Sequence, residues 1–518
     1  MQKLKRAGFT AASFVVILLV MLLLGQAMTP DWQVEPYRDH LQVSTRSTAI
    51  ASSLGTTTPE GTHPVRERKI SITLDGGVHI QAIVREPSDR KGTGPACLFI
   101  HGAGTGKSSE VYGDLASAMA SAGITTLVPD KRLDTYTTFH RDYQAMAADY
   151  GHSLERLRSW PGVDPTKVGL YAESEGTWIS TIMTAKDPSI AFSILTSPPV
   201  YPGRRQMSMA ATSYLDLIGA PEGIRNVIPR LMGMNLSLLG LEYADFPSLP
   251  YLDKLRMPVM VNFGTMDVSM PVEQGAREII SRTHASGNDN VTLRYYPTNH
   301  QIRTGSRLAK AGLPLEPRYT HNLEDWINAV ALGTHANQWS TPMIAGSQPH
   351  QLTRVPDRTD AGLLSSLTAL VTLMASGPIL LAAALISAMI GALSSHLRAR
   401  GNGHRQSGFS KGLTGRLWSL GLLAAGLMTA LLAYAFTVVR KALGLTYLSS
   451  MMASCWSLLS VLCLVLILLL ASTLTSIFNR ADGKPAVAGA GHWLTLTLIL
   501  LGSLAILGSL IFWNILVF

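Results

Sequence analysis

Five stretches of this chain hold no Asp, Glu, Lys or Arg, and together they make up more than a quarter of its 518 residues. They span residues 9–28, 361–395, 417–439, 442–479 and 485–518. Each is long enough for a helix to cross the roughly 30 Å apolar core of a bilayer at about 1.5 Å per residue. All 43 Lys and Arg and all 34 Asp and Glu lie in the remaining residues, at nearly the density of a soluble protein. We therefore expect a membrane part and a water-soluble part in one chain.

The net charge of +9 fits either a nucleic-acid partner or a membrane surface. Its distribution favours the membrane, because basic residues gather beside the apolar stretches and no basic-aromatic pattern typical of nucleic-acid binding accompanies them. The flanking basic residues are Lys3, Lys5, Arg6, Arg398, Arg400, Arg405, Lys411, Arg416, Arg480 and Lys484. The positive-inside rule puts these residues in the cytoplasm. We expect a cytoplasmic N-terminus, residues 29–360 outside the cytoplasmic membrane, four further spans and no nucleic-acid partner.

The first apolar stretch has two interpretations. Gly25-Gln26-Ala27 resembles the small-residue cleavage site of a signal peptide, whereas the length of the stretch suits an uncleaved anchor. We favour the anchor, and in both cases the following segment is exported.

Residues 65–335 are predicted to form an α/β domain. Alternating apolar residues on both sides of Asp75-Gly76-Gly77 predict an antiparallel hairpin. Short apolar strands then alternate with helical segments, which indicates a mostly parallel sheet with helices on both faces. The predicted organisation is a membrane anchor or signal at 1–30, a linker at 31–64, the α/β domain with a helical cap insertion at 201–255, a linker at 336–360 and a transmembrane region of about four spans at 361–518.

A nucleophile elbow is predicted at Ser174. The strand ending near Ala172 runs into Glu173-Ser174-Glu175 and then into a helix that starts at Gly176. A serine on such a tight turn needs small residues two positions before and after it, and Ala172 and Gly176 meet that need. Ala172 replaces the first glycine of the G-x-S-x-G pattern.

A serine nucleophile needs a base and a group that orients the base. Asp267 follows a predicted buried strand at 258–263, and His300 follows the next predicted strand, at 291–296. The chain order Ser, Asp, His, with each residue just beyond a strand, is typical of serine hydrolysis on an α/β sheet. We predict Ser174, Asp267 and His300 as a catalytic triad.

The turn His101-Gly102-Ala103-Gly104 follows a predicted strand, where backbone N–H groups can form an oxyanion hole. We pair the amide of Ala103 with that of Glu175, the residue after the predicted nucleophile. The alternative is a phosphate-binding loop that ends at Gly106-Lys107-Ser108, but that pattern requires a glycine where this chain has His101. The sequence contains no H-E-x-x-H and no C-x-x-C pattern, so we expect no metal.

These motifs resemble the α/β-hydrolase family, in its branch of secreted or membrane esterases and dipeptidyl-aminopeptidase-like serine hydrolases. His101-Gly102-Ala103-Gly104 resembles that branch's H-G-[SA]-G turn, Pro129-Asp130-Lys131-Arg132 its D-K-R-G loop, and residues 174–179 its S-E-G-G-W-I elbow. Leu133 stands where the loop glycine is expected, and Glu173 stands where a histidine often precedes the nucleophile. The resemblance implies hydrolysis of an ester, thioester or amide through an acyl-serine, without a metal or an organic cofactor.

We therefore predict a membrane-anchored serine hydrolase that acts outside the cytoplasm on a small-molecule or lipid-like ester. The alternatives are an aminopeptidase-like amide hydrolase and a catalytically silent hydrolase fold that binds partners in an envelope complex. The C-terminal spans hold no charged residue at mid-membrane, which favours an anchor in the lipid bilayer over a transporter, with small residues available to a membrane-protein partner.

The two glutamates beside Ser174 also have two interpretations. Glu173 and Glu175 either attract a cationic substrate, such as one with a free amino group, or form a solvated rim and a charge at the start of a helix. We favour the second interpretation.

Overall fold

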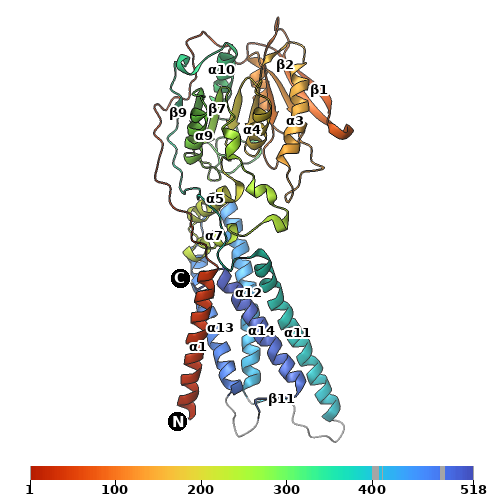
Figure 1. Cartoon of the computed structure of the whole chain (residues 1–518), viewed down its shortest axis with the longest axis vertical. Coiled ribbons are helices and arrows are strands. Elements are labelled where there is room, and N and C mark those ends of the chain that lie inside the picture. Colours follow the sequence, from red (N-terminus) through yellow and green to blue (C-terminus); the bar gives the residue numbers. More distant parts are fainter. Residues whose placement is uncertain (1, 400–407, 411, 479–484, 517–518) are drawn as a thin grey trace. The chain divides into compact units, whose positions relative to one another are not determined.

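The computed structural model describes residues 2–399, 408–410, 412–478 and 485–516, and they form two compact units (Figure 1). The sheet unit comprises Val34–Ser213 and Leu236–Asp357, and the helical unit comprises Met1–Gln33, Tyr214–Asn235 and Arg358–Phe518. The predicted cytoplasmic residues Arg400, Arg405, Lys411, Arg480 and Lys484 lie outside the described residues.

The sheet unit contains a nine-stranded sheet in the order β1-β2-β4-β3-β5-β6-β7-β8-β9. Its strands are β1 (Val65–Thr73), β2 (His79–Pro87), β3 (Gly94–Ile100), β4 (Thr125–Pro129), β5 (Val163–Glu173), β6 (Ser193–Thr196), β7 (Val259–Gly264), β8 (Val291–Tyr296) and β9 (Ile344–Gly346). β2 pairs antiparallel with β1 and with β4, and the other pairs are parallel. The predicted hairpin and mostly parallel sheet are confirmed.

Helices cover both faces of this sheet (Figure 1). They are α2 (Gly113–Ser121), α3 (Tyr143–Arg158), α4 (Gly176–Lys186), α9 (Gln274–Ala285) and α10 (Tyr319–Ala331). Because successive side chains of a strand point to opposite faces, Leu98 of β3 packs with the α3 and α4 side while Phe99 packs with the α2 and α10 side. Cys97 is fully buried in β3, and burial raises the pKa of its thiol, as expected of an inert core residue.

The segment 201–255 is largely helical and contributes to both units. Its elements are α5 (Gly203–Leu217), α6 (Glu222–Arg225), α7 (Val227–Met232), the 3-10 turns η2 (Ser237–Leu239) and η3 (Glu242–Asp245), and α8 (Leu249–Leu252). Residues Tyr214–Asn235 belong to the helical unit, and the residues on either side belong to the sheet unit. That this segment caps an active site stays a prediction.

The segments predicted as linkers are attached to the sheet. Arg294 of β8 is buried, and its guanidinium donates hydrogen bonds to the carbonyl oxygens of Thr48 and Ala49, at 2.9 and 3.2 Å. The second segment supplies the short edge strand β9, which pairs with β8, and a 3-10 turn, η4 (Ala336–Gln338). Residues 34–64 and 336–357 of these two segments therefore belong to the folded sheet unit.

The described residues of the helical unit include five helices that are long and apolar enough to cross a membrane, judged by length and composition. They are α1 (Gln2–Ala27), α11 (Leu367–Ala399), α12 (Leu413–Leu443), α13 (Ser450–Phe478) and α14 (Ala490–Phe512). α11 packs on α14, α12 on α13, and α1 on α13 (Figure 1). The predicted apolar helices, one near the N-terminus and four near the C-terminus, are confirmed.

Arg230 of α7 joins the C-terminal ends of α1 and α14. Its guanidinium donates hydrogen bonds of 2.7 Å to the carbonyl oxygens of Ile511 and Phe512, and one of 2.9 Å to that of Gly25. The last carbonyls of a helix have no partner within the helix and carry partial negative charge, so a cation suits them. α1 and α14 therefore end at the same side of the helical unit.

Candidate active site

Ser174 occupies a sharp turn between β5 and α4. Its φ is +53°, a left-handed conformation that non-glycine residues rarely adopt. A Cβ at Gly176 would lie 2.7 Å from the carbonyl oxygen of Ile100 and 2.8 Å from that of His101, so only glycine fits there. Ala172 is fully buried and pairs with both neighbouring strands, which explains why the turn tolerates alanine in place of the first glycine.

Asp267 and His300 lie together beyond the ends of β7 and β8. The His300 Nδ1 atom is 2.6 Å from Asp267 Oδ2, and Asp267 Oδ1 accepts hydrogen bonds from the backbone N–H and hydroxyl of Ser269. Burial acts to raise the pKa of Asp267, but the charge of His300 and these hydrogen bonds hold it below its usual range. Asp267 is therefore ionised at neutral pH and fixes the orientation of the imidazole.

The turn at Ser174 and the His300 loop are linked through the end of β6. The Ser174 N–H donates to the Thr196 carbonyl oxygen at 2.9 Å, and the hydroxyl of Ser197, the next residue, donates to the His300 carbonyl oxygen at 2.7 Å. Ser174 Oγ forms no hydrogen bond with another described residue. Such bonds are often long in unliganded sites and shorten when substrate binds.

The two predicted oxyanion donors lie on adjoining segments. Gly102 is packed against the turn, because a Cβ there would lie 3.0 Å from the Glu173 carbonyl oxygen and 3.2 Å from Ser174 Cβ. Within the described residues, the N–H groups of Ala103 and Glu175 donate to no other protein group. Two backbone N–H groups without a protein acceptor, beside a serine, are the kind of donors that form an oxyanion hole.

Lys131 and His101 hold the glycine-rich turn in place. The Lys131 side chain is only 1% exposed, and its Nζ donates to the Gly102 carbonyl oxygen at 2.6 Å. His101 Nε2 lies 2.7 Å from the Pro129 carbonyl oxygen. Burial lowers the pKa of His101 to about 4, so its imidazole is neutral at pH 7 and donates that hydrogen bond. The D-K-R loop therefore supports the turn that carries Ala103.

The carboxylate of Glu175 is buried among four cationic and phenolic groups. Tyr136 and Tyr143 donate hydrogen bonds of 2.7 and 2.9 Å, Arg141 Nη1 donates one of 2.5 Å, and Lys131 Nζ lies 3.7 Å away. Glu175 precedes the first residue of α4, as the helix-start interpretation expects, but at 4% exposure it does not belong to a solvated rim, so that part of the interpretation is wrong. Its partners come from the segment 131–143, which the local sequence around Ser174 does not reveal.

Glu173 is also buried, at 7% exposure, so the solvated-rim interpretation is wrong here too. Its charge acts on His300 across the site. Burial acts to lower the pKa of His300, but the charge of Asp267, its hydrogen bond and the charge of Glu173 hold the pKa above its usual value. Glu173 is therefore a second carboxylate, besides Asp267, that acts on His300. It stands directly before Ser174, where the elbow motif of the resembled family often has a histidine.

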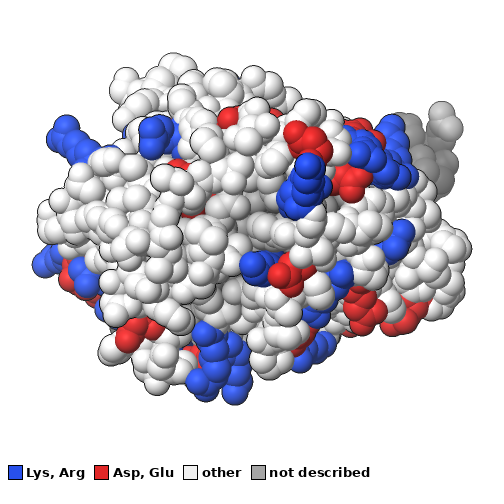
Figure 2. Space-filling model, turned by 90° about the horizontal axis from the view of Figure 1, so that it is seen from above, with Lys and Arg blue, Asp and Glu red and all other residues white. Residues whose placement is uncertain are grey.

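The alternative phosphate-binding loop is occupied by a carboxylate. Asp130 Oδ1 accepts hydrogen bonds of 2.7 Å from both the backbone N–H and the hydroxyl of Ser108, and Lys107 Nζ lies 3.3 Å from Oδ2. An anion there would have to displace Asp130. The face in Figure 2 shows basic and acidic side chains interspersed among large uncharged areas.

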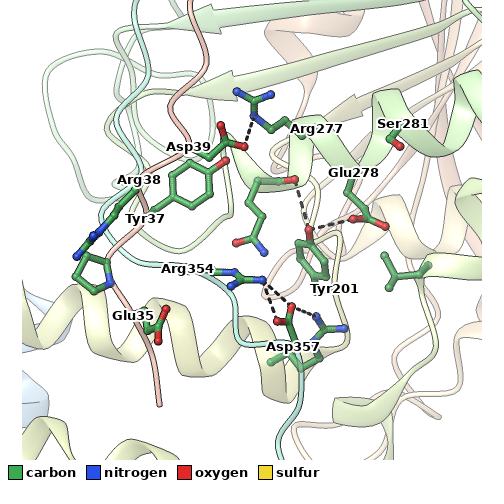
Figure 3. A pocket seen from close by; sticks show the side chains of 14 residues that line it. Glu35, Tyr37, Arg38, Asp39, Tyr201, Arg277, Glu278, Ser281, Arg354 and Asp357 are labelled. Atoms are coloured by element: carbon green, nitrogen blue, oxygen red, sulfur yellow. Dashed lines mark hydrogen bonds and ion pairs between the residues drawn. The ribbon is translucent and has the colours of Figure 1, made fainter. Parts of the chain in front are cut away.

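A pocket of about 1000 Å³ lies elsewhere in the sheet unit, and no predicted triad residue lines it (Figure 3). Its charged groups neutralise one another, since Arg277 pairs with Asp39 and Arg354 with Asp357. Tyr201 donates a hydrogen bond to Glu278 at 3.3 Å. Four arginines and four carboxylates line the pocket, so it favours neither anions nor cations.

The sheet begins with two antiparallel strand pairs and continues as a parallel series, and a strained serine turn follows β5. These features define an α/β-hydrolase fold. No family model and no curated protein matches the sequence. Solved structures with a similar chain include the Pyrococcus furiosus esterase Pf2001, at 16% identity and a TM-score of 0.34, covering 51% of this chain and 90% of that one.

Two further solved structures match a similar share of the chain. A Klebsiella pneumoniae protein assigned as a dienelactone hydrolase is 13% identical, with a TM-score of 0.36, and the match covers 53% of this chain and 100% of that one. A Bacteroides ovatus protein assigned as a dipeptidyl aminopeptidase IV is 16% identical, with a TM-score of 0.36, over 52% of this chain and 36% of that one.

Proposed function

We propose that this protein is a membrane-anchored serine hydrolase that cleaves a small-molecule or lipid-like ester, or a thioester, through an acyl-serine intermediate. The observation that carries the proposal is the backbone of Ser174. A left-handed serine between a buried strand and a helix is costly, and such strain persists at sites where it serves function. The Asp267–His300 pair, beyond β7 and β8 of the same sheet, is the base that we propose for this serine.

The proposed chemistry follows from these groups. A neutral His300 that donates Nδ1–H to Asp267 keeps Nε2 as an acceptor, so it takes the Ser174 hydroxyl proton as Oγ attacks the carbonyl carbon. The N–H groups of Ala103 and Glu175 stabilise the resulting oxyanion. His300 then returns the proton to the leaving alcohol, and a water molecule cleaves the acyl-serine by the same steps in reverse.

We further propose that the α/β unit works outside the cytoplasmic membrane. The basic residues beside the apolar helices support a cytoplasmic N-terminus. Five passes would then bring the C-terminal ends of α1 and α14 to the outer side together, and Arg230 binds these two ends. The apolar helices would anchor the enzyme and offer packing surfaces to a membrane-protein partner.

The test compares wild type and Ser174→Ala in membranes treated with a fluorescent fluorophosphonate, which labels activated serines. We expect labelling of wild type and none of the variant, because the reagent bonds to the nucleophilic Oγ. Ser153→Ala, at a buried serine of α3, is the control and should still be labelled. A folded wild type that takes no label would favour the silent binding module. After labelling, amino-acyl anilides compared with simple esters separate an aminopeptidase from an esterase.

A Glu173→Gln variant should stay active at lower pH than wild type does. Hydrolysis needs neutral His300, so kcat/KM falls as pH drops through the pKa of this residue in the free enzyme. The charge of Glu173 helps to raise that pKa, and its removal should move the acid limb to lower pH. A pH profile of kcat/KM with a nitrophenyl ester measures the shift, with Glu67→Gln on exposed β1 as the control. An unmoved limb would show that Glu173 does not act on His300.

A further inference from the structure

A second cluster of ionisable side chains lies on α10 and on the segment before β1. Glu60, His321 and Glu324 each offer one ligand atom, and these atoms lie within 4.8 Å of one another. His321 Nδ1 is 3.4 Å from Glu60 Oε2 and 4.0 Å from Glu324 Oε2. The edge of a tetrahedron with metal bonds of 2.0–2.1 Å is about 3.4 Å, so small side-chain rotations would bring all three atoms onto one ion.

Glu324 gives an independent indication of a ligand at this cluster. Its side chain is only 1% exposed, and its Oε1 atom is buried without a hydrogen-bond partner among the described residues. A buried carboxylate oxygen without a partner is costly, and such groups are normally paired or bound to a metal. An ion could reach the cluster from solvent, because the side chains of His321 and Glu60 are 48% and 33% exposed.

The charges around the cluster are also unbalanced. Glu60, Glu324 and the adjacent Asp325 bring three carboxyl groups, against which His321 is the one basic side chain in the described cluster. A divalent cation would neutralise this excess and bind the unpaired carboxyl oxygen of Glu324.

We propose that Glu60, His321 and Glu324 bind one divalent transition-metal ion of the zinc class, with water in the remaining position. One imidazole with two carboxylates suits zinc, whereas Ca²⁺ and Mg²⁺ take oxygen ligands and rarely imidazole. The ion ties residue 60, just before β1, to the last helix of the α/β unit. Thr320 already orients one ligand by donating a hydrogen bond of 2.8 Å to Glu60 Oε2. This site is separate from the proposed hydrolytic residues, and its role is structural.

The test titrates Zn²⁺ alone into the full-length protein in detergent, after removal of metal by a chelator and without a polyhistidine tag. We expect one Zn²⁺ per chain and no comparable binding of Ca²⁺ or Mg²⁺. His321→Ala and Glu60→Gln, both at partly exposed positions, should weaken binding by at least tenfold, since even outer-shell changes at metal sites cost about 10–100-fold. His284→Ala removes an exposed histidine that contacts Asp289 and should keep wild-type affinity.

A Glu324→Gln variant separates a metal ligand from a merely buried acid. Glutamine keeps nearly the same side-chain volume but removes the carboxylate that would bind the ion. With Zn²⁺, wild type should gain thermal stability and the glutamine variant should gain much less. Absence of saturable Zn²⁺ binding, or equal affinity in wild type and His321→Ala, would overturn the proposal.

Discussion

Replacing His300 by alanine is expected to lower kcat for ester hydrolysis by about 10⁶-fold, and replacing Asp267 by asparagine by about 10⁴-fold. The two effects differ because they remove different functions. In the proposed mechanism, no group accepts the Ser174 proton once His300 is removed, so the serine hydroxyl stays a weak nucleophile. With asparagine in place of Asp267, the imidazole remains but loses the carboxylate that orients it at 2.6 Å and stabilises its charged form.

Single-turnover and steady-state rates with a nitrophenyl ester measure both losses, and fluorophosphonate labelling should fall in the same order. His152→Ala is a matched control, because His152 Nε2 lies 3.1 Å from Asp75 Oδ1 in another histidine–aspartate pair, away from the serine turn. It should keep wild-type kcat. A decrease of less than tenfold for His300→Ala would exclude this histidine as the base and with it the proposed triad.

Much of the fold was predictable because its signals are local. The helix predicted to start at Gly176 begins there as α4, and the strand predicted at 291–296 has the same bounds as β8, since glycine, proline and asparagine residues mark such ends. The edge strand β9 was missed because three residues, Ile344–Gly346, are too few to show an alternating pattern. Its pairing with β8 depends on a long-range contact that sequence periodicity does not contain.

The same division between local and distant signals holds at the candidate site. The turn at Ser174 could be predicted because its requirements for small residues lie within two positions of the serine. The burial of Glu175 could not, because its partners Tyr136, Arg141 and Tyr143 lie more than thirty residues away in sequence. The one available signal was Lys131, which belongs to the D-K-R motif and contacts both Gly102 and Glu175.

The Lys131–Glu175 contact makes Glu175 the residue of the turn whose loss should destabilise the fold most. We expect Glu175→Ala to lower the free energy of unfolding of the α/β unit by about 3–5 kcal/mol, the usual cost of leaving one partner of a buried ion pair alone. The variant would leave Lys131, at 1% exposure, and Arg141, at 18%, without their shared carboxylate. Exposed pairs cost much less when broken, about 1 kcal/mol or below.

Thermal unfolding of the detergent-solubilised chain measures this difference, with Asp245→Ala as the control. Asp245 accepts a hydrogen bond of 2.6 Å from Arg204 but is 47% exposed, so its loss should lower the melting temperature only slightly. If burial of the uncompensated Lys131 charge causes the loss, adding Lys131→Met to Glu175→Ala should recover part of the stability. Equal melting temperatures for Glu175→Ala and Asp245→Ala would show that the Glu175 carboxylate does not hold the serine turn and the D-K-R loop together.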